Sequence, residues 1–307
     1  MMPILDWLDG FMYYPILVVV LIGAGLWFTF KTKFVNITMI GESIRVVREK
    51  PEEEGAISSF KALMVSTASR VGTGNIVGVA TAVCIGGFGS VFWMWVIAII
   101  GMASAFVEST LAQIYKKRNP EDGSSYGGPA YYIEDALHSR TLGIVFAIFL
   151  ILTYAGGFNM LASFNLQASF AAFGFYQEGV TNWIIGAILA VLVGYCIFGG
   201  GKRITAVTGV LVPIMGVIYI IVALIVVFAH VNLIPGVIKE IFVNAFDFKA
   251  AAGGFAGSCM LYGIKRGLFS NEAGVGSAPN AAAAASVSHP VKQGLVQMFS
   301  VSHPVKQ

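Results

Sequence analysis

Seven long apolar stretches, separated by polar connections, make up most of this 307-residue chain. A helix needs about 20 apolar residues to cross the hydrocarbon core of a bilayer. Only helices and closed barrels satisfy their backbone polar groups there, and these stretches lack the alternation of a barrel strand. The pattern therefore predicts an all-α polytopic membrane protein, with spans near residues 11–30, 57–84, 90–114, 142–173, 182–199, 206–229 and 250–268.

The second stretch is interrupted by glycines and polar residues. Residues 66–80 read S-T-A-S-R-V-G-T-G-N-I-V-G-V-A, in the middle of the predicted span. A dinucleotide fingerprint does not fit, because the third glycine comes one residue late, and a phosphate-binding loop would need a lysine that is missing here. A close-packed helix face would explain the glycines. It would not explain Ser69, Thr73 and Asn75 beside them, so we favour a discontinuous helix.

A membrane helix that breaks at mid-depth leaves backbone N–H and C=O groups unpaired, and each costs several kcal/mol unless something polar binds there. The N-terminus of a half-helix suits a carboxylate, and freed carbonyls suit Na⁺. An α-amino acid and a sodium ion together supply both ligands. A second glycine-rich interruption, at residues 250–263, lies five spans later. This spacing is expected of an inverted repeat in a transporter.

Charged residues are scarce and unevenly distributed. They make up 11% of the chain, compared with about 25% in a soluble domain. Lysine and arginine gather in alternate loops, and the positive-inside rule places those loops in the cytoplasm and the N-terminus outside. The protein is therefore expected in the plasma membrane, such as a bacterial inner membrane. Because the basic residues are explained by topology, we expect no nucleic-acid partner, and no obligate protein partner is evident.

The sequence offers little chemistry typical of an enzyme. Cys84, Cys196 and Cys259 are embedded in apolar sequence and are interpreted as small packing residues. No cysteine–histidine cluster has metal-ligand spacing, and the scattered histidines and acids form no nucleophile–base pattern. A channel would present repeated polar faces along a pore, whereas the polar groups here gather at two breaks. A secondary transporter is the favoured interpretation.

Three sequence blocks resemble those of one transporter family. They are V-G-T-G-N-I-V-G-V-A at 71–80, G-G-P-A-Y-Y-I at 127–133 and R-G-L-F-S-N-E-A-G-V-G-S-A-P at 266–279. They are similar to the signatures of the alanine/glycine:cation symporters, the sodium:alanine symporter family, over about residues 5–299. That family resembles the neurotransmitter:sodium symporters in fold.

The resemblance implies an inverted-repeat amino-acid transporter fold in one membrane domain, residues 1–307. It implies a preliminary span at 11–30, a first five-helix repeat at 57–229 and the start of a second repeat at 250–299. Because the family normally continues for four more spans, the second repeat is expected to be incomplete here.

The implied function is sodium-coupled symport of small neutral amino acids, alanine or glycine, into the cell. The partners are then the amino acid, Na⁺ and the lipid bilayer. Three alternatives remain: a proton-coupled amino-acid transporter, a transport-inactive fragment that lacks the last four spans and, less favoured, a channel.

The candidate site residues fall into three groups, of which the resemblance implies the first two and the position of charged residues within or beside the predicted spans suggests the third. The first group binds the amino acid. The second group consists of backbone carbonyls that bind sodium. The third group has a gating or structural role, with Glu108 as the expected partner of Arg70. The amides of the fourth span could instead simply bond a neighbouring helix. The expected substrate-binding residues are Thr73, Gly74, Asn75, Asn159, Asn165, Gln167, Gly254 and Phe255; the carbonyls are those of Ala68 and Val71; the third group is Arg70, Glu108, Asn271 and Glu272.

The end of the chain carries an exact duplication. Residues 286–293 read S-V-S-H-P-V-K-Q, and residues 300–307 repeat these letters. The spacing matches no repeat architecture of 20 to 50 residues. We interpret residues 300–307 as an anomalous tail from a truncated or mis-assembled reading frame; the alternative is a regulatory tail.

Overall fold

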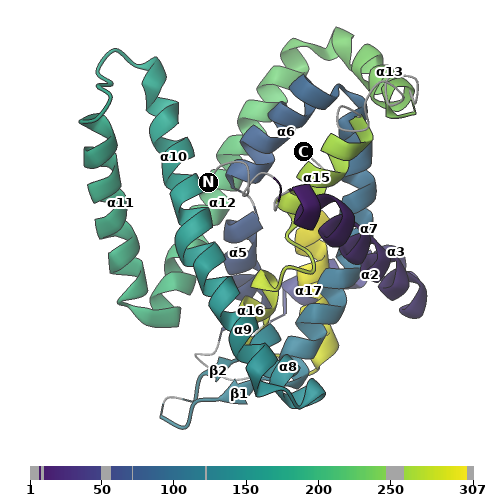
Figure 1. Cartoon of the computed structure of the whole chain (residues 1–307), viewed down its shortest axis with the longest axis vertical. Helices are drawn as coiled ribbons and strands as arrows, with labels where there is room; N and C mark the ends of the chain where they lie inside the picture. Colours follow the sequence, from purple (N-terminus) through teal and green to yellow (C-terminus); the bar gives the residue numbers. More distant parts are fainter. Residues whose placement is uncertain are drawn as a thin grey trace.

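The computed structural model describes residues 7, 10–49, 57–70, 72–121, 123–246 and 259–302, and it is predominantly helical (Figure 1). Within these residues, three helical stretches are long and apolar enough to cross a membrane, which agrees with a polytopic membrane protein. They are Gly89–Ile114, Arg140–Ala172 and Gly200–Ala229, and shorter apolar helices cover Val18–Lys31, Val77–Gly86 and Thr181–Ile197.

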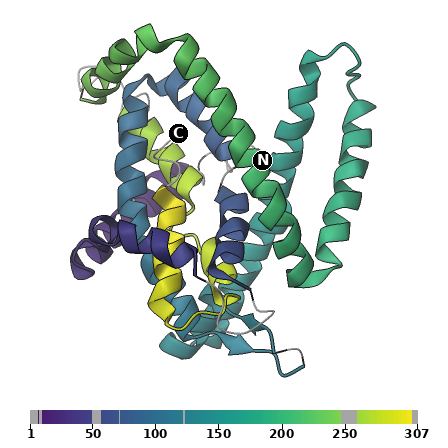
Figure 2. The same ribbon diagram turned by 180° about the vertical axis from the view of Figure 1, so that it is seen from behind.

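Helix α7 (Gly89–Ile114) is the centre of the packed part of the protein. Helices α15 (Cys259–Asn271) and α17 (Pro290–Ser302) lie against it, as both views show (Figures 1 and 2). Glycines permit this close approach: a Cβ atom added to Gly263 would lie 2.5 Å from the Ser90 carbonyl oxygen of α7. The apolar core at this junction includes Val46, Met102, Ala105, Leu295, Val296, Met298 and Val301.

The predicted first span is helical, and two short helices follow it. The π-helical η1 (Met12–Leu17) continues into α2 (Val18–Lys31), which packs against α7. Helix α3 (Val35–Thr38) then leads to α4 (Ile40–Val47), which packs against α17.

The second predicted span, over residues 57–84, is two helices. Helix α5 (Ser59–Arg70) ends at Arg70, and α6 (Thr73–Gly86) begins at Thr73. Between them, Gly72 has an extended backbone, with φ −130° and ψ −152°. The predicted interruption of this helix is therefore confirmed. The second predicted interruption, with Gly254 and Phe255, lies outside the described residues.

A helical hairpin stands beside the packed part, at the left of Figure 1, where α10 and α11 run antiparallel. No residue of α11 is buried, and Trp183 in its first turn is 80% exposed. Such continuous apolar exposure is unusual for a protein in water and is expected of a surface that contacts lipid. The elements are α9 (Arg140–Ile151), the π-helix η2 (Leu152–Phe158), α10 (Asn159–Ser169), the 3₁₀-helix η3 (Phe170–Ala172), α11 (Thr181–Ile197) and α12 (Gly200–Ala229).

The connections contain more structure than their polar sequence indicates. The charged loop after α7 forms an antiparallel pair of strands, β1 (Lys117–Arg118) and β2 (Ser125–Tyr126), followed by α8 (Pro129–Leu137). After α12, the 3₁₀-helix η4 (Val231–Leu233) leads to α13 (Ile234–Ala245).

The first three residues of the two copies of the duplicated segment differ in conformation. Ser286 to Ser288 are irregular, after the short helix α16 (Ser277–Ala283), whereas Ser300 to Ser302 form the last residues of α17. Val301 is fully buried in the core. The start of the second copy therefore packs as part of the fold, and residues 303–307 lie outside the described residues.

Candidate functional site

The break between α5 and α6 is held by the side chain of Asn75. Its Nδ2 donates a hydrogen bond of 2.8 Å to the carbonyl of Arg70, the last residue of α5. Its backbone N–H donates to the Gly72 carbonyl at 3.1 Å. The Asn75 Oδ1 also accepts a hydrogen bond from the Ser270 hydroxyl of α15. A single buried amide thus joins both half-helices to α15.

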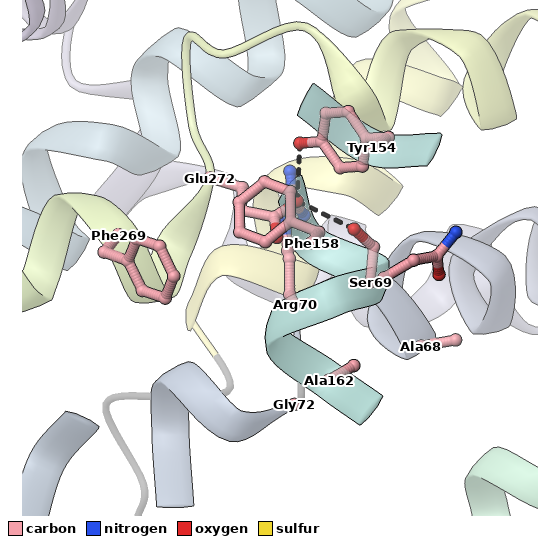
Figure 3. A pocket seen from close by; sticks show the side chains of 10 residues that line it. Ala68, Ser69, Arg70, Gly72, Tyr154, Phe158, Ala162, Phe269 and Glu272 are labelled. Atoms are coloured by element: carbon pink, nitrogen blue, oxygen red, sulfur yellow. Dashed lines mark hydrogen bonds between the residues drawn. The ribbon is translucent and has the colours of Figure 1, made fainter. Parts of the chain in front are cut away.

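A cavity of about 250 Å³ lies beside this break (Figure 3). Three parts of the chain build it: the end of α5 with Gly72, the η2–α10 segment, and the end of α15. Tyr154 and Phe158 supply aromatic rings on one side, and the Phe158 ring lies 5.5 Å from that of Phe269 on the other. The lining residues are Ala68, Ser69, Arg70, Gly72, Tyr154, Phe158, Asn159, Ala162, Phe269 and Glu272.

The carboxylate of Glu272 is the most heavily hydrogen-bonded group at the cavity. Its Oε2 atom accepts bonds from the hydroxyls of Ser69 at 2.8 Å, Tyr154 at 3.1 Å and Ser277 at 2.8 Å. Figure 3 shows the bonds from Ser69 and Tyr154. Glu272 follows α15 directly and has a φ of +48°, a left-handed conformation that is uncommon for a residue with a side chain. This turn directs the carboxylate to hydroxyls from three separate elements.

Arg70 occupies the last turn of α5 and is only 2% exposed. Its Nη1 donates to the Gln297 carbonyl of α17 at 3.2 Å, while its Nε and Nη2 have no hydrogen-bond partner among the described residues. Its charge interacts with the carboxylates of Glu108 and Glu272. The predicted pairing with Glu108 is therefore electrostatic, and the Glu108 Oε1 accepts its hydrogen bond from the Gly274 amide at 3.3 Å.

Comparison with known protein families matches residues 1–303 to the sodium:alanine symporter family. The chain belongs to this family. The sequence is 50% identical to the amino-acid carrier protein AlsT of Bacillus subtilis over 282 residues, which cover 92% of this chain and 59% of that protein. It is 46% identical to the probable sodium/glutamine symporter GlnT of the same organism, over 95% of this chain and 60% of that protein.

A more distant relative is the sodium/alanine symporter AgcS of Methanococcus maripaludis, 39% identical over 94% of this chain and 64% of that protein. The sodium:alanine symporters are transporters, not enzymes. The chain spans about three fifths of the length of the curated relatives it matches.

In this sodium:alanine symporter family member, Asn159 is the fourth-span amide that lies at the cavity. Its Nδ2 donates to the carbonyl of Ala155, in its own helix, at 3.2 Å. Asn165 and Gln167 do not line this cavity. Asn165 donates to the Leu161 carbonyl at 2.9 Å, and the Gln167 Oε1 accepts from the Tyr176 hydroxyl at 2.8 Å.

The remaining predicted residues divide between packing positions and undescribed ones. Asn271 is buried and donates to the Ile97 carbonyl of α7 at 3.3 Å, so it joins α15 to α7. Thr73 and Gly74 form the first turn of α6, where only the backbone is described. Val71, Gly254 and Phe255 lie outside the described residues.

Four residues that contribute to this region were not predicted from the sequence: Tyr154, Phe158, Phe269 and Ser277. Two signals were present in the sequence. Tyr154 is a phenol within an apolar stretch, just before the pair Gly156 and Gly157. Ser277 belongs to the third family-like block, five residues after Glu272. Neither signal identifies which residues meet across the fold.

Proposed function

We propose that this sodium:alanine symporter family member carries out sodium-coupled symport of small neutral amino acids, alanine or glycine, into the cell. The observation that carries this proposal is the break between α5 and α6, which borders the 250 Å³ cavity. Backbone groups at such a break are stabilised by a polar ligand, since unpaired groups cost several kcal/mol in hydrocarbon.

The two ends at the break suit two different ligands. The first turn of α6 presents N–H groups and the positive end of the helix dipole, which favours a carboxylate. We assign the amide of Gly74 and the hydroxyl of Thr73 to the amino-acid carboxylate, together with the amide of Asn75, which must first release its hydrogen bond to the Gly72 carbonyl. The C-terminal end of α5 presents carbonyls, and we assign those of Ala68 and Val71 to Na⁺.

The amino group of the substrate requires an acceptor on the opposite wall. We assign this role to Asn159, because it lines the cavity, and we include Asn165 and Gln167 as less direct candidates. Gly254 and Phe255 are assigned to the same site by the resemblance, as part of a second break. In this proposal residues 57–229 form one repeat, and residues 250–299 begin its inverted counterpart.

Glu272 is proposed as a gate on one side of the site. Its carboxylate links α5, η2 and α16 through three hydroxyls, so these elements cannot separate while the bonds persist. Arg70, Glu108 and Asn271 support this region by charge and by packing. The proposed orientation places the N-terminus outside and the β1–β2 connection in the cytoplasm of a cell bounded by the plasma membrane.

Proton coupling is the second candidate, and the burial of Glu108 favours it. This acid is 7% exposed, lies within α7 and interacts with Arg70. Buried acids within membrane spans commonly belong to proton relays. Alanine uptake that rises saturably with external Na⁺ supports sodium coupling, whereas uptake that ignores Na⁺ and follows a pH gradient supports proton coupling through Glu108.

The binding assignment is tested with Gly74→Val in the purified chain. A side chain at Gly74 would occupy the space assigned to the substrate carboxylate, so alanine binding should be abolished. Gly78→Ala is the matched control, because a Cβ there would meet its nearest atom, Cδ of Arg266, at an ordinary 3.7 Å. Near-normal alanine affinity in Gly74→Val would show that the site is wrongly placed.

A further inference from the structure

The Glu272 hydroxyl cluster, made up of Glu272, Ser69, Tyr154 and Ser277, lies between two cavities. The first is the 250 Å³ cavity beside the helix break. The second, of about 380 Å³, lies among α5, α9, η2 and α16 and is lined by Ser277 and Asn280. Ser69 and Tyr154 line both cavities. The cluster therefore adjoins both cavities, with Glu272 lining the first and Ser277 the second.

The charges around this cluster do not balance. Arg70, Glu108 and Glu272 are 2%, 7% and 6% exposed, and their charges interact with one another. Three hydroxyls donate to one Glu272 oxygen, which is the arrangement expected of an ionised carboxylate. When Glu108 is ionised as well, one guanidinium and two carboxylates carry a net charge of −1. An uncompensated charge at membrane depth is costly, so one further positive charge would stabilise the cluster.

The same atoms offer suitable ligands for a monovalent cation. Carboxylate and hydroxyl oxygens are hard donors, the type that hard cations prefer. A hydroxyl has two lone pairs besides its proton, so Ser69, Tyr154 and Ser277 can each present an oxygen to a cation bound at Glu272. The cluster thus combines oxygen ligands, a missing positive charge and a position between two cavities.

We propose that the Glu272 hydroxyl cluster is a binding site for one sodium ion, separate from the carbonyl site at the helix break. The ion is bound by the Glu272 carboxylate and the hydroxyls of Ser69, Tyr154 and Ser277. This inference rests on the proposed function only in taking Na⁺ as the coupling ion. The site gives the ion a station between the break and the second cavity.

The test is a count of radioactive sodium ions bound per molecule of the purified chain in detergent, without amino acid. The unmodified chain should bind two ions, one at the break and one at the cluster, and Glu272→Gln should bind one. Tyr154→Phe, which removes one oxygen and keeps the ring, should weaken the second ion about threefold or more. The matched control is Glu121→Gln, an exposed carboxylate in the β1–β2 turn, which should still bind two.

Each other number of bound sodium ions supports or overturns one of the two proposed sodium sites. Two ions in Glu272→Gln would overturn the cluster site. One ion in both the unmodified chain and Glu272→Gln would also overturn it, while leaving the sodium at the break intact. One ion in the unmodified chain and none in Glu272→Gln would support the cluster and refute the carbonyl site. No ion in the unmodified chain overturns both sodium sites, and alanine binding then decides separately whether the amino-acid site stands. If Glu272→Gln does not fold, Tyr154→Phe and Ser277→Ala decide, since an unchanged second ion in both refutes the cluster.

Discussion

Alanine substitutions at four glycines test the packing of α15 on α7. The loss of stability should grow as the space for an added Cβ atom shrinks. An added Cβ on Gly263 would lie 2.5 Å from the Ser90 carbonyl oxygen and 2.6 Å from the Trp93 Cβ, against 3.4 Å for an ordinary contact. On Gly267 the nearest atom would be the Ile97 Cβ at 3.1 Å, and on Gly78 the Arg266 Cδ at 3.7 Å. On Gly216 of α12 no atom lies within 4 Å.

The expected cost of each alanine follows from these distances. In Gly263→Ala the two helices must separate by about 0.9 Å at Ser90, the difference between 3.4 and 2.5 Å, and overpacking of this kind costs about 1–3 kcal/mol. Gly267→Ala requires about 0.3 Å, the difference between 3.4 and 3.1 Å, and should cost less. Gly78→Ala and Gly216→Ala meet no obstacle, and each gains up to about 1 kcal/mol of helix propensity.

The assay is the thermal unfolding midpoint of the four purified variants in one detergent. A change of 1 kcal/mol shifts the midpoint by roughly 2–4 °C in domains somewhat smaller than this chain. Gly263→Ala should therefore lose several degrees, Gly267→Ala fewer, and the other two should be unchanged or slightly more stable. Equal midpoints for Gly263→Ala and Gly216→Ala would refute the packing of α15 on α7, and with it the positions of Phe269 and Glu272.

Two further predictions concern topology and the substrate amide. With the native cysteines removed, Glu121→Cys in the β1–β2 turn should resist membrane-impermeant thiol reagents in intact cells and react after permeabilisation; ready labelling of intact cells would reverse the proposed orientation. Asn159→Ala should weaken alanine binding by about tenfold, roughly 1.4 kcal/mol, because Asn159 lines the cavity, whereas Asn165→Ala should change it little. The opposite order would move the amino-group contact to Asn165.

Hydropathy predicted where the helices of this chain lie better than it predicted which helices contact one another. The stretch 90–114 is α7, Gly89–Ile114, because a long charge-free run in lipid has no other way to satisfy its backbone. The predicted span 206–229 begins too late. Helix α12 starts at Gly200, and the charged residues Lys202 and Arg203, which the prediction left in a loop, belong to its first turn. The Arg203 Nη1 donates to the Tyr195 carbonyl at 3.0 Å, which gives one of its donors a partner at the helix end.

Burial of α17 could not be predicted from composition. Gln293 and Gln297 are polar, yet both are fully buried. The Gln293 Nε2 donates to the Ser59 hydroxyl of α5 at 3.0 Å, and the backbone carbonyl of Gln297 accepts from Arg70, whereas the side-chain amide of Gln297 has no hydrogen-bond partner among the described residues. These partners lie 234 and 227 residues away in the sequence. Local pattern indicates that a polar residue needs a partner, but only the fold determines which residue supplies it.

The same limit applies to the candidate site. The break near Gly72 was predictable, since Ser69, Thr73 and Asn75 lie beside the glycines and a close-packed helix face would not explain these polar side chains. The contact between Ser69 and Glu272 joins residues 203 positions apart. The π-helix η2, which brings Tyr154 to Glu272, has no distinct signal in hydropathy. Asn159 and Glu272 were therefore predictable as site residues, whereas the aromatic side chains of Tyr154, Phe158 and Phe269 were missed.

The glycines themselves distinguish the two interpretations of residues 66–80. Where glycine serves packing in this protein, an added Cβ would collide, as at Gly263 with Ser90. At the break the situation differs: a Cβ on Gly72 would meet its nearest atom, the Ser69 carbonyl oxygen, at 3.8 Å. The φ of −130° at Gly72 is also accessible to residues with a side chain. Neither packing nor backbone strain within the described residues requires glycine there. This favours a requirement for open space beside the backbone, as expected where a ligand approaches it.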